Sequence, residues 1–340
     1  MGPVPRILLA ILAALSLAAC DRAQPAVTLY SSVDTEFLRM VVSEYQRQTG
    51  VRVNIVGDTE ATKTTGLIER ILAEQHRPRG DVWWSSEALG SVRLAEAGAL
   101  EPVELDEAAL GFPDGWPGHL RADDNAWRGF AARARVICFN TDRLVAEDVP
   151  RDLAELADPK WRGRVGIARP EFGTTRTHMA ALAGAHGAGA FESWLRAMKA
   201  NGMRIFDGNA TAVRAVAQGQ IDLCLTDTDD VWAGQRNDWP VGLVYEATGA
   251  ISRGPLLIPN TAGLIRGGPN REAGLDLLGY ILSPEVERLL AESDSRNAPV
   301  RPALAAKYAR WAIPAPWLVG AADIAAAERE AMAICDRVLR

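Results

Sequence analysis

The sequence predicts an α/β protein of two lobes with a central cleft between the lobes. Short apolar strands alternate with amphipathic helices along most of the chain, a pattern typical of sheets covered by helices. This pattern runs twice, first over residues 27–130 and again over residues 131–249. The length of 340 residues, less a predicted export signal, is also enough for two domains of ordinary size.

The first unit opens with a strand and a helix whose limits are marked by residue type. Phe37, Val41 and Tyr45 recur at intervals of four and therefore form one apolar helical face. Gly50 ends this helix, and the residues after it alternate in polarity as a strand does. The expected elements are strands at residues 27–30, 51–56 and 81–84 and helices over residues 37–45, 67–72 and 86–97.

The second unit repeats the alternation and then returns to the first unit. Ser283 followed by Pro284 marks the start of a late helix, with the serine as its cap. The expected elements are strands at residues 134–139, 165–167, 204–206, 221–225, 256–258 and 263–265 and helices from residue 175 and over residues 210–218.

Two segments cross between the units, near Arg133 and over residues 245–254. Ligands usually bind in the cleft between two such lobes, which close around the ligand by a hinge motion. The expected division is lobe 1 from residues 27–130 plus 250–340 and lobe 2 from residues 131–249.

The N-terminus carries an export signal. The almost wholly apolar residues 7–19 follow Arg6 and are too few to span a bilayer, which is typical of a secretory signal. We therefore expect residues 1–19 to form a signal peptide.

The signal ends on Leu17-Ala18-Ala19-Cys20, which resembles the lipobox of bacterial lipoproteins. The resemblance implies that Cys20 is lipidated and that residues 20–26 form a linker to the membrane. Asp21 resembles the signal that retains a lipoprotein at the inner membrane. We expect a periplasmic, lipid-anchored protein, the alternative being an ordinary signal peptide cut after Ala19.

Charge and cysteine content exclude some classes of partner and fold. The net charge of −6 and the lack of a basic cluster argue against nucleic acid binding. Cys138 and Cys224 lie in apolar strand-like runs, and Cys335 leaves an odd number in an oxidising compartment. We expect buried thiols and no disulfide framework.

Several stretches, through their order and spacing taken together, carry a family resemblance. The chain resembles the periplasmic ferric-iron-binding proteins, which are type II solute-binding proteins of ABC importers. The resemblance implies a monomer without a cofactor that carries a small ligand or ion to the permease and ATPase subunits. The matching stretches are Leu29-Tyr30-Ser31-Ser32, Gly80 to Trp84, Gly129 to Asn140, Asp158 to Val165, Lys199 to Gly202 and Leu282 to Glu285.

The chain departs from this family at the ligand. The iron-binding members commonly hold Fe(III) with two adjacent tyrosines, and the matching positions here are Asp229 and Asp230. Many members also have a histidine after the first strand, where this chain has Asp34 or a near neighbour. The ligand therefore stays open between ferric iron or another hard cation and an amine-bearing zwitterion.

The candidate ligand residues follow the carboxyl ends of strands, where ligands bind in open α/β sheets. They combine hydroxyls and carboxylates at the starts of predicted helices, so helix capping is the alternative role for each of them. The candidates are Ser31, Ser32, Asp34, Thr59, Glu60, Ser85, Ser86, Glu87, Arg133, Thr174, Thr175, Asp227, Asp229 and Asp230.

Two kinds of chemistry compete for these loops. Helix N-termini favour an anion, and Arg133 and Arg135 lie on one face of a strand where a guanidinium could assist. The crowded carboxylates instead favour a hard cation or an ammonium group. A zwitterion would satisfy both ends. If a metal binds, the candidate ligands are Asp34, Glu87, Asp229 and Asp230.

The chain lacks the common catalytic motifs. It has no P-loop, GxSxG, HExxH or CxxC pattern, so we expect a binding protein and not an enzyme. The alternatives are a ligand-sensing module for a membrane receptor and a hydrolase that uses paired carboxylates.

Overall fold

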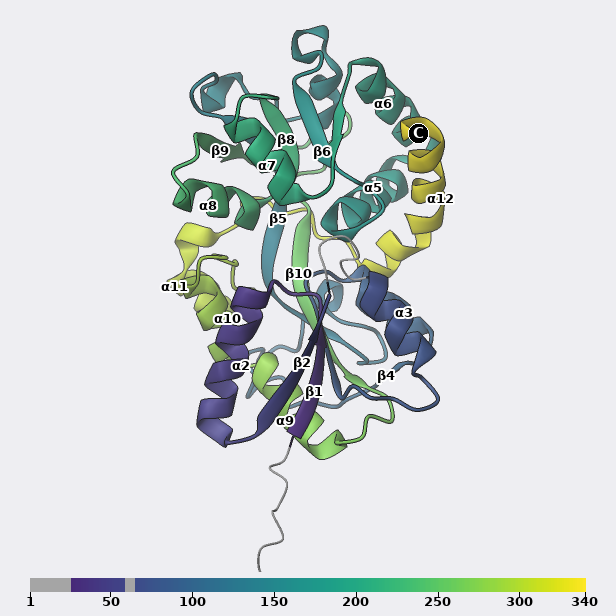
Figure 1. The fold of residues 1–340 in the computed structure, drawn as a ribbon, viewed down its shortest axis with the longest axis vertical. Coiled ribbons are helices and arrows are strands. Elements are labelled where there is room, and N and C mark those ends of the chain that lie inside the picture. Colours follow the sequence, from purple (N-terminus) through teal and green to yellow (C-terminus); the bar gives the residue numbers. More distant parts are fainter. Residues whose placement is uncertain (1–25, 59–64) are drawn as a thin grey trace, which may run out of the picture.

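The computed structural model describes residues 26–58 and 65–340 (Figure 1). The predicted signal peptide, Cys20, Thr59 and Glu60 lie outside the described residues. None of the helices within the described ranges is long and apolar enough to cross a membrane.

The first lobe is built on a mixed sheet at one end of the molecule (Figure 1). The strand β1 (Ala26–Ser31) lies between β2 (Arg52–Gly57) and β3 (Val82–Ser85), parallel to both. β10 (Leu257–Ile265) returns antiparallel to β3 and also pairs with β4 (Leu100–Glu101). The helices of this lobe are α2 (Thr35–Thr49), α3 (Thr65–Ala73), α4 (Leu89–Glu96), α9 (Arg271–Ile281), α10 (Pro284–Glu292) and α11 (Pro302–Lys307).

The predicted apolar face explains why α2 forms and where it packs. Val41 and Tyr45 are buried in the core of the first lobe, together with Leu38 and Val42 from the same helix. Gly50 ends α2 in the left-handed conformation at φ 71°, which glycine adopts without steric cost. The N-terminus of α2 is thereby fixed beside the carboxyl end of β1.

A single long strand joins the two lobes. β5 (Arg128–Asn140) pairs with β10 along its first half, from Arg128 to Ala134. Its second half, from Arg135 to Asn140, pairs with β8 and β9 of the second lobe. The change of partner therefore falls between Ala134 and Arg135. β5 and β10 run through the middle of the molecule (Figure 1).

The second lobe continues the same sheet, in the order β5-β8-β6-β7. Its strands are β6 (Val165–Ala168), β7 (Arg204–Phe206), β8 (Leu223–Asp227) and β9 (Val241–Val244). Its helices are α5 (Gly173–His186), α6 (Ala188–Ala200), α7 (Asn209–Ala217) and α8 (Thr228–Arg236). Because β6 and β8 are parallel, the loops after their carboxyl ends open on the same edge of the sheet. The predicted α/β class is confirmed.

The C-terminal helix α12 (Ala321–Leu339) packs mainly against the second lobe, along α5 and α6 (Figure 1). Its buried residues Ile324, Ile334 and Val338 belong to the same core as Met179 and Leu195 of those helices. The predicted division, which grouped all of residues 250–340 with lobe 1, therefore differs from the packing at this helix. An amphipathic helix needs an apolar surface to cover, and here α5 and α6 provide it.

The cysteines agree with the sequence prediction. Cys138, Cys224 and Cys335 are buried free thiols. Cys138 and Cys224 lie opposite each other on β5 and β8, inside the second lobe. These side chains therefore contribute to packing as small apolar groups.

Candidate functional site

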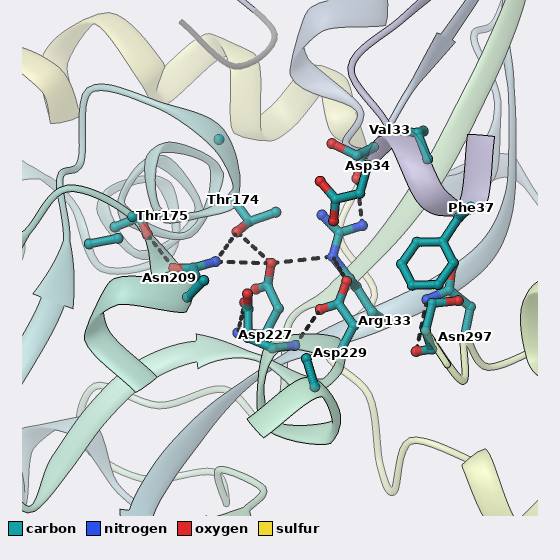
Figure 2. Close-up of a pocket in the computed structure, with 18 of the residues that line it drawn as sticks. Val33, Asp34, Phe37, Arg133, Thr174, Thr175, Asn209, Asp227, Asp229 and Asn297 are labelled. Carbon is teal, nitrogen blue, oxygen red and sulfur yellow. Dashed lines mark hydrogen bonds and ion pairs between the residues drawn. The ribbon is translucent and has the colours of Figure 1, made fainter. Parts of the chain in front are cut away.

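A cavity of about 260 Å³ lies between the two lobes, where β5 passes from one to the other. Asp34 and Phe37 line it from the first lobe, and Thr174, Asn209 and Asp229 line it from the second. Figure 2 shows Asp34 and Arg133 on one side of the view, Thr174, Thr175 and Asn209 on the other, and Asp227 between them.

Asp227 is the centre of a buried ionic network at the floor of this cavity. Its Oδ1 accepts a hydrogen bond from Arg135 Nη1 at 2.8 Å. Its Oδ2 accepts from Arg133 Nε at 3.2 Å, the Thr174 hydroxyl at 2.6 Å and Asn209 Nδ2 at 3.2 Å. The carboxylate predicted to bind ligand is thus already surrounded by protein donors.

The charges in this network determine which groups are ionised. Burial alone would raise the pKa of Asp227, but Arg135 and Arg133 hold it below its usual value. Burial likewise opposes the charge on Arg133, whose pKa is nevertheless raised by Asp229, Asp227 and Asp34. Asp227 and Arg133 therefore both stay charged, and each stabilises the ionised form of the other.

The other two aspartates at the start of α8 have different surroundings. Oδ2 of Asp229 lies 3.5 Å from Arg133 Nε, and the Asp229 side chain is 20% exposed at the cavity. Asp230 accepts from the Thr226 hydroxyl at 2.9 Å and from the backbone N–H of Asp227 at 3.4 Å. Asp230 therefore also caps α8, the alternative role considered for it.

The starts of α5 and α7 form the opposite wall. Thr174 and Thr175 lie in the first turn of α5, and Asn209 begins α7. The Thr175 hydroxyl donates to Asn209 Oδ1 at 3.4 Å, which links the two helix starts. Backbone N–H groups at helix N-termini favour negative charge, so this wall is suited to an anionic group.

The serine loops of the first lobe are partly occupied by local hydrogen bonds. Ser31 Oγ accepts from the backbone N–H of Val33, and Ser32 Oγ accepts from that of Ser86. Ser85 Oγ lies 3.3 Å from Ser32 Oγ. Of these serines, Ser86 is the one that lines the cavity, and its carbonyl accepts from Arg133 Nη1 at 2.6 Å.

Glu87 does not lie at the cavity with the aspartates. Its carboxylate accepts from the backbone N–H groups of Leu89 at 2.6 Å and Gly90 at 3.0 Å, so it caps the start of α4. The Thr177 hydroxyl of α5 donates to the same carboxylate at 3.2 Å. Burial raises the pKa of Glu87. The structure therefore does not bring Glu87 together with Asp34, Asp229 and Asp230 as the predicted metal set requires.

Comparison with known proteins identifies the family. A family model described as "Bacterial extracellular solute-binding protein" matches residues 92–324, more than two thirds of the chain. The chain belongs to this family. The predictions of a solute-binding protein of an ABC importer, and of a binding protein instead of an enzyme, are confirmed.

The similar proteins differ in what their names say they bind. Iron uptake protein A2 of Synechocystis sp. is 31% identical over 255 residues, covering 71% of this chain and 72% of that protein. A putative 2-aminoethylphosphonate-binding periplasmic protein of Salmonella paratyphi A is 24% identical over 304 residues, covering 86% of this chain and 84% of that protein. The structure of iron-bound HitA from Pseudomonas aeruginosa matches with a TM-score of 0.78 at 25% identity, covering 92% of this chain and 99% of that chain.

This solute-binding protein also has cavity residues that the sequence analysis missed. Asn209 follows β7, so the rule that selected the other loops would have selected it too. Phe37 belongs to the predicted apolar face of the first helix, and in the structure it also lines the cavity at the start of α2. Asn297 reaches the cavity from the segment after α10, and no sequence signal marks it.

Proposed function

We propose that this solute-binding protein captures a small zwitterion with an amino group at one end and a phosphonate, phosphate or carboxylate group at the other. The observation that carries the proposal is the division of the cavity into two walls of opposite preference. The wall with Asp34 and Asp229 favours a cation, and the wall formed by the starts of α5 and α7 favours an anion.

The amino group is expected to bind at Asp34 and Asp229. Asp34 is exposed at the start of α2, and Asp229 lines the cavity at the start of α8. Both carboxylates act on Arg133, whose single charge is also shared with Asp227. Asp34, Asp227 and Asp229 therefore outnumber the two arginines that pair with them, Arg133 and Arg135, and a ligand ammonium group offsets the excess negative charge.

The anionic group is expected to bind at Thr174, Thr175 and Asn209. These residues present two helix starts to the same cavity, with Arg135 directly behind Thr174. The Arg135 side chain is fully buried and donates to Thr174 Oγ1 at 3.2 Å. Two positive helix ends and a buried guanidinium all favour negative charge on this side.

The similarity to the 2-aminoethylphosphonate-binding protein supports this ligand class, because that molecule has an amine and a phosphonate. The residues that line the described cavity include no tyrosine, so a phenolate shell of the usual iron-binding kind has no source there. Tyr30, the closest in sequence to the first loop, donates its hydroxyl to Glu74 at 2.7 Å.

A hard cation is the second candidate. The carboxylate oxygens of Asp227, Asp229 and Asp230 lie within 4.8 Å of one another, and oxygen-rich clusters suit such ions. The names of the iron uptake relatives favour the same candidate. Against it, Asp227 is bound by two arginines and Asp230 caps α8, so two of the three carboxylates already bind protein donors.

Thermal shift measurements with matched half-ligands test the proposal. The protein is purified without its signal peptide and mixed with 2-aminoethylphosphonate, ethylphosphonate, ethanolamine or ferric citrate. We expect the zwitterion to raise the melting temperature more than either half-ligand, because each half engages one wall. A ligand at 100 times its dissociation constant stabilises a protein by about 2.7 kcal/mol. Stoichiometric iron after purification, with no response to the zwitterion, would reject the proposal in favour of the hard cation.

We also propose that the protein is anchored by lipid on Cys20 and stays at the inner membrane. The lipobox and the Asp21 that follows it support this proposal. Mass spectrometry of the membrane-extracted protein should show acyl chains on an N-terminal Cys20. The Cys20→Ala variant should remain unprocessed, and an unmodified mature N-terminus in the wild type would contradict the anchor.

A further inference from the structure

A buried chain of polar side chains leads from Asp227 into the second lobe. Arg135, which donates to Asp227, also donates through Nε to His178 Nδ1 at 3.4 Å. His178 Nε2 lies 3.7 Å from Oε1 of Glu246. The side chains of Arg135, His178 and Glu246 are each at most 1% exposed. Their atoms Nη2, Nε2 and Oε1 make no hydrogen bond to any described residue.

The arginine fixes the proton of His178. A guanidinium can only donate hydrogen bonds, so Nδ1 of His178 accepts and the ring carries its proton on Nε2. Burial, followed by the charge of Arg135, lowers the pKa of His178 well below its usual value. His178 is therefore neutral, and its N–H faces Glu246.

Glu246 is surrounded by groups from several elements. Arg135 faces it from β5, His178 from α5, and Asp152 from the start of the short helix η4 (Leu153–Ala157). Burial raises the pKa of Glu246 to about 8, with a smaller raising effect from Asp152, while a hydrogen bond with Ser252 and the charge of Arg135 oppose the increase. When Glu246 is neutral, Asp227 is the one charged carboxylate in the buried row Asp227–Arg135–His178–Glu246, and it alone in that row pairs with the charge of Arg135.

We propose that Arg135, His178 and Glu246 are positioning residues that act on the cleft through Asp227 and Thr174. While Glu246 carries a proton, the guanidinium of Arg135 pairs with Asp227 alone. Loss of that proton would place a second negative charge behind Arg135. The buried guanidinium of Arg135 would then interact with two charged carboxylates, Asp227 on one side and Glu246 on the other. The consequence for ligand rests on the proposed function: the wall at Thr174 would hold an anionic group more weakly above the titration midpoint of Glu246.

A carboxyl-carbon NMR titration of protein labelled in glutamate measures this proton directly. The Glu246→Gln variant assigns the signal, and we expect a midpoint above pH 7 in the wild type. A midpoint near 4, where exposed glutamates titrate, would overturn the proposal. Because no ligand is added, a failed ligand screen does not affect this result.

The coupling to the cleft is tested with Asp227→Asn, which leaves Arg135 without its nearest carboxylate. The freed charge should lower the midpoint of Glu246 by about one pH unit or more. An unchanged midpoint would show that the two ends are independent. If this variant does not fold, Thr174→Val removes a donor from Asp227 and an acceptor from Arg135. The ion pair between Arg135 and Asp227 should then strengthen. Because Arg135 would interact less with Glu246, the titration midpoint of Glu246 should rise.

The pH dependence of stability is a second readout. The pKa of Glu246 is higher in the folded protein than its ordinary value of 4.5, so the folded state keeps a proton that the unfolded state releases. The resulting stability is full below about pH 4.5 and is lost as the pH rises through about 8. We expect Glu246→Gln to lose this slope and to melt at a higher temperature than the wild type at pH 8. The exposed control Glu147→Gln should keep the wild-type slope, and equal slopes in all three proteins would overturn the proposal.

Discussion

Replacing Asp227 with asparagine should destabilise the fold, because this carboxylate neutralises two buried arginines. The side chains of Arg135 and Arg133 are 0% and 8% exposed, and that of Asp227 is 3% exposed. Asparagine keeps the size and one acceptor oxygen but removes the charge. Breaking a buried ion pair costs about 3–5 kcal/mol because the remaining charge stays buried. We expect the free energy of unfolding of Asp227→Asn to fall by about that amount.

Asp229→Asn is the matched control, since it makes the same chemical change two residues later. The Asp229 side chain is 20% exposed and lies at the longer distance of 3.5 Å from Arg133. Because the Asp229 pair is longer and less buried than the Asp227 pairs, this variant should lose less stability than Asp227→Asn. The difference between the two variants isolates the effect of burial.

Urea unfolding followed by tryptophan fluorescence at pH 7 measures both variants. Far-ultraviolet circular dichroism checks that each variant is folded before denaturant is added. If Asp227→Asn loses no more stability than Asp229→Asn, the view of Asp227 as the buried counter-ion of both arginines is wrong. Added salt should change the difference little, because buried pairs are weakly screened.

Three further predictions concern the ligand and the contact between the lobes. Replacing Asp34 and Asp229 together with asparagine should weaken binding of an amine-bearing ligand at least tenfold by calorimetry, with little change in the urea midpoint, because both side chains face the cavity. Protein freshly purified and then mixed with ferric citrate should show no visible phenolate-to-iron absorption band, and a salmon-coloured protein would contradict the description of the cavity. Glu87→Ala should lower the free energy of unfolding by about 1–3 kcal/mol, because it leaves buried N–H donors at the start of α4 without an acceptor. Glu87→Gln should lose less, since it retains an acceptor, and equal losses would show that the cap is not the cause.

The long crossing strand shows what an apolar pattern alone misses. The sequence predicts a strand at residues 134–139, whereas β5 begins at Arg128. The missed half contains Arg128 and Arg133, and charged residues do not indicate a buried strand. Their burial depends on carboxylates distant in sequence, since Glu107 lies 21 residues from Arg128 and Asp227 lies 94 residues from Arg133. Such pairings are fixed by the tertiary fold.

In the last strand, the sequence pattern divides one strand into two. The sequence predicts two strands, at residues 256–258 and 263–265, whereas the structure has one strand, β10. Its pairing with β5 is irregular between Pro259 and Asn260. Proline has no N–H to donate and interrupts a strand pattern, although the chain continues extended on both sides of it. The local sequence predicts the two ends of the strand, and the pairing with β5 and β3 makes them one strand.

Asp227, Asp229 and Asp230, at the start of α8, show why the sequence predicts where the site lies but not what each residue does there. All three follow the carboxyl end of β8, so the rule for open α/β sheets selects them together. Asp227, the last residue of the strand, points toward β5 and meets Arg133 and Arg135. Asp229 lies in the first turn beside the cavity, and Asp230 turns back to the backbone of Asp227. The three carboxylates lie within 4.8 Å of one another, yet each has a different set of protein donors. The predicted cluster of like charges is therefore a buried counter-ion, a carboxylate that is 20% exposed beside the cavity, and a helix cap.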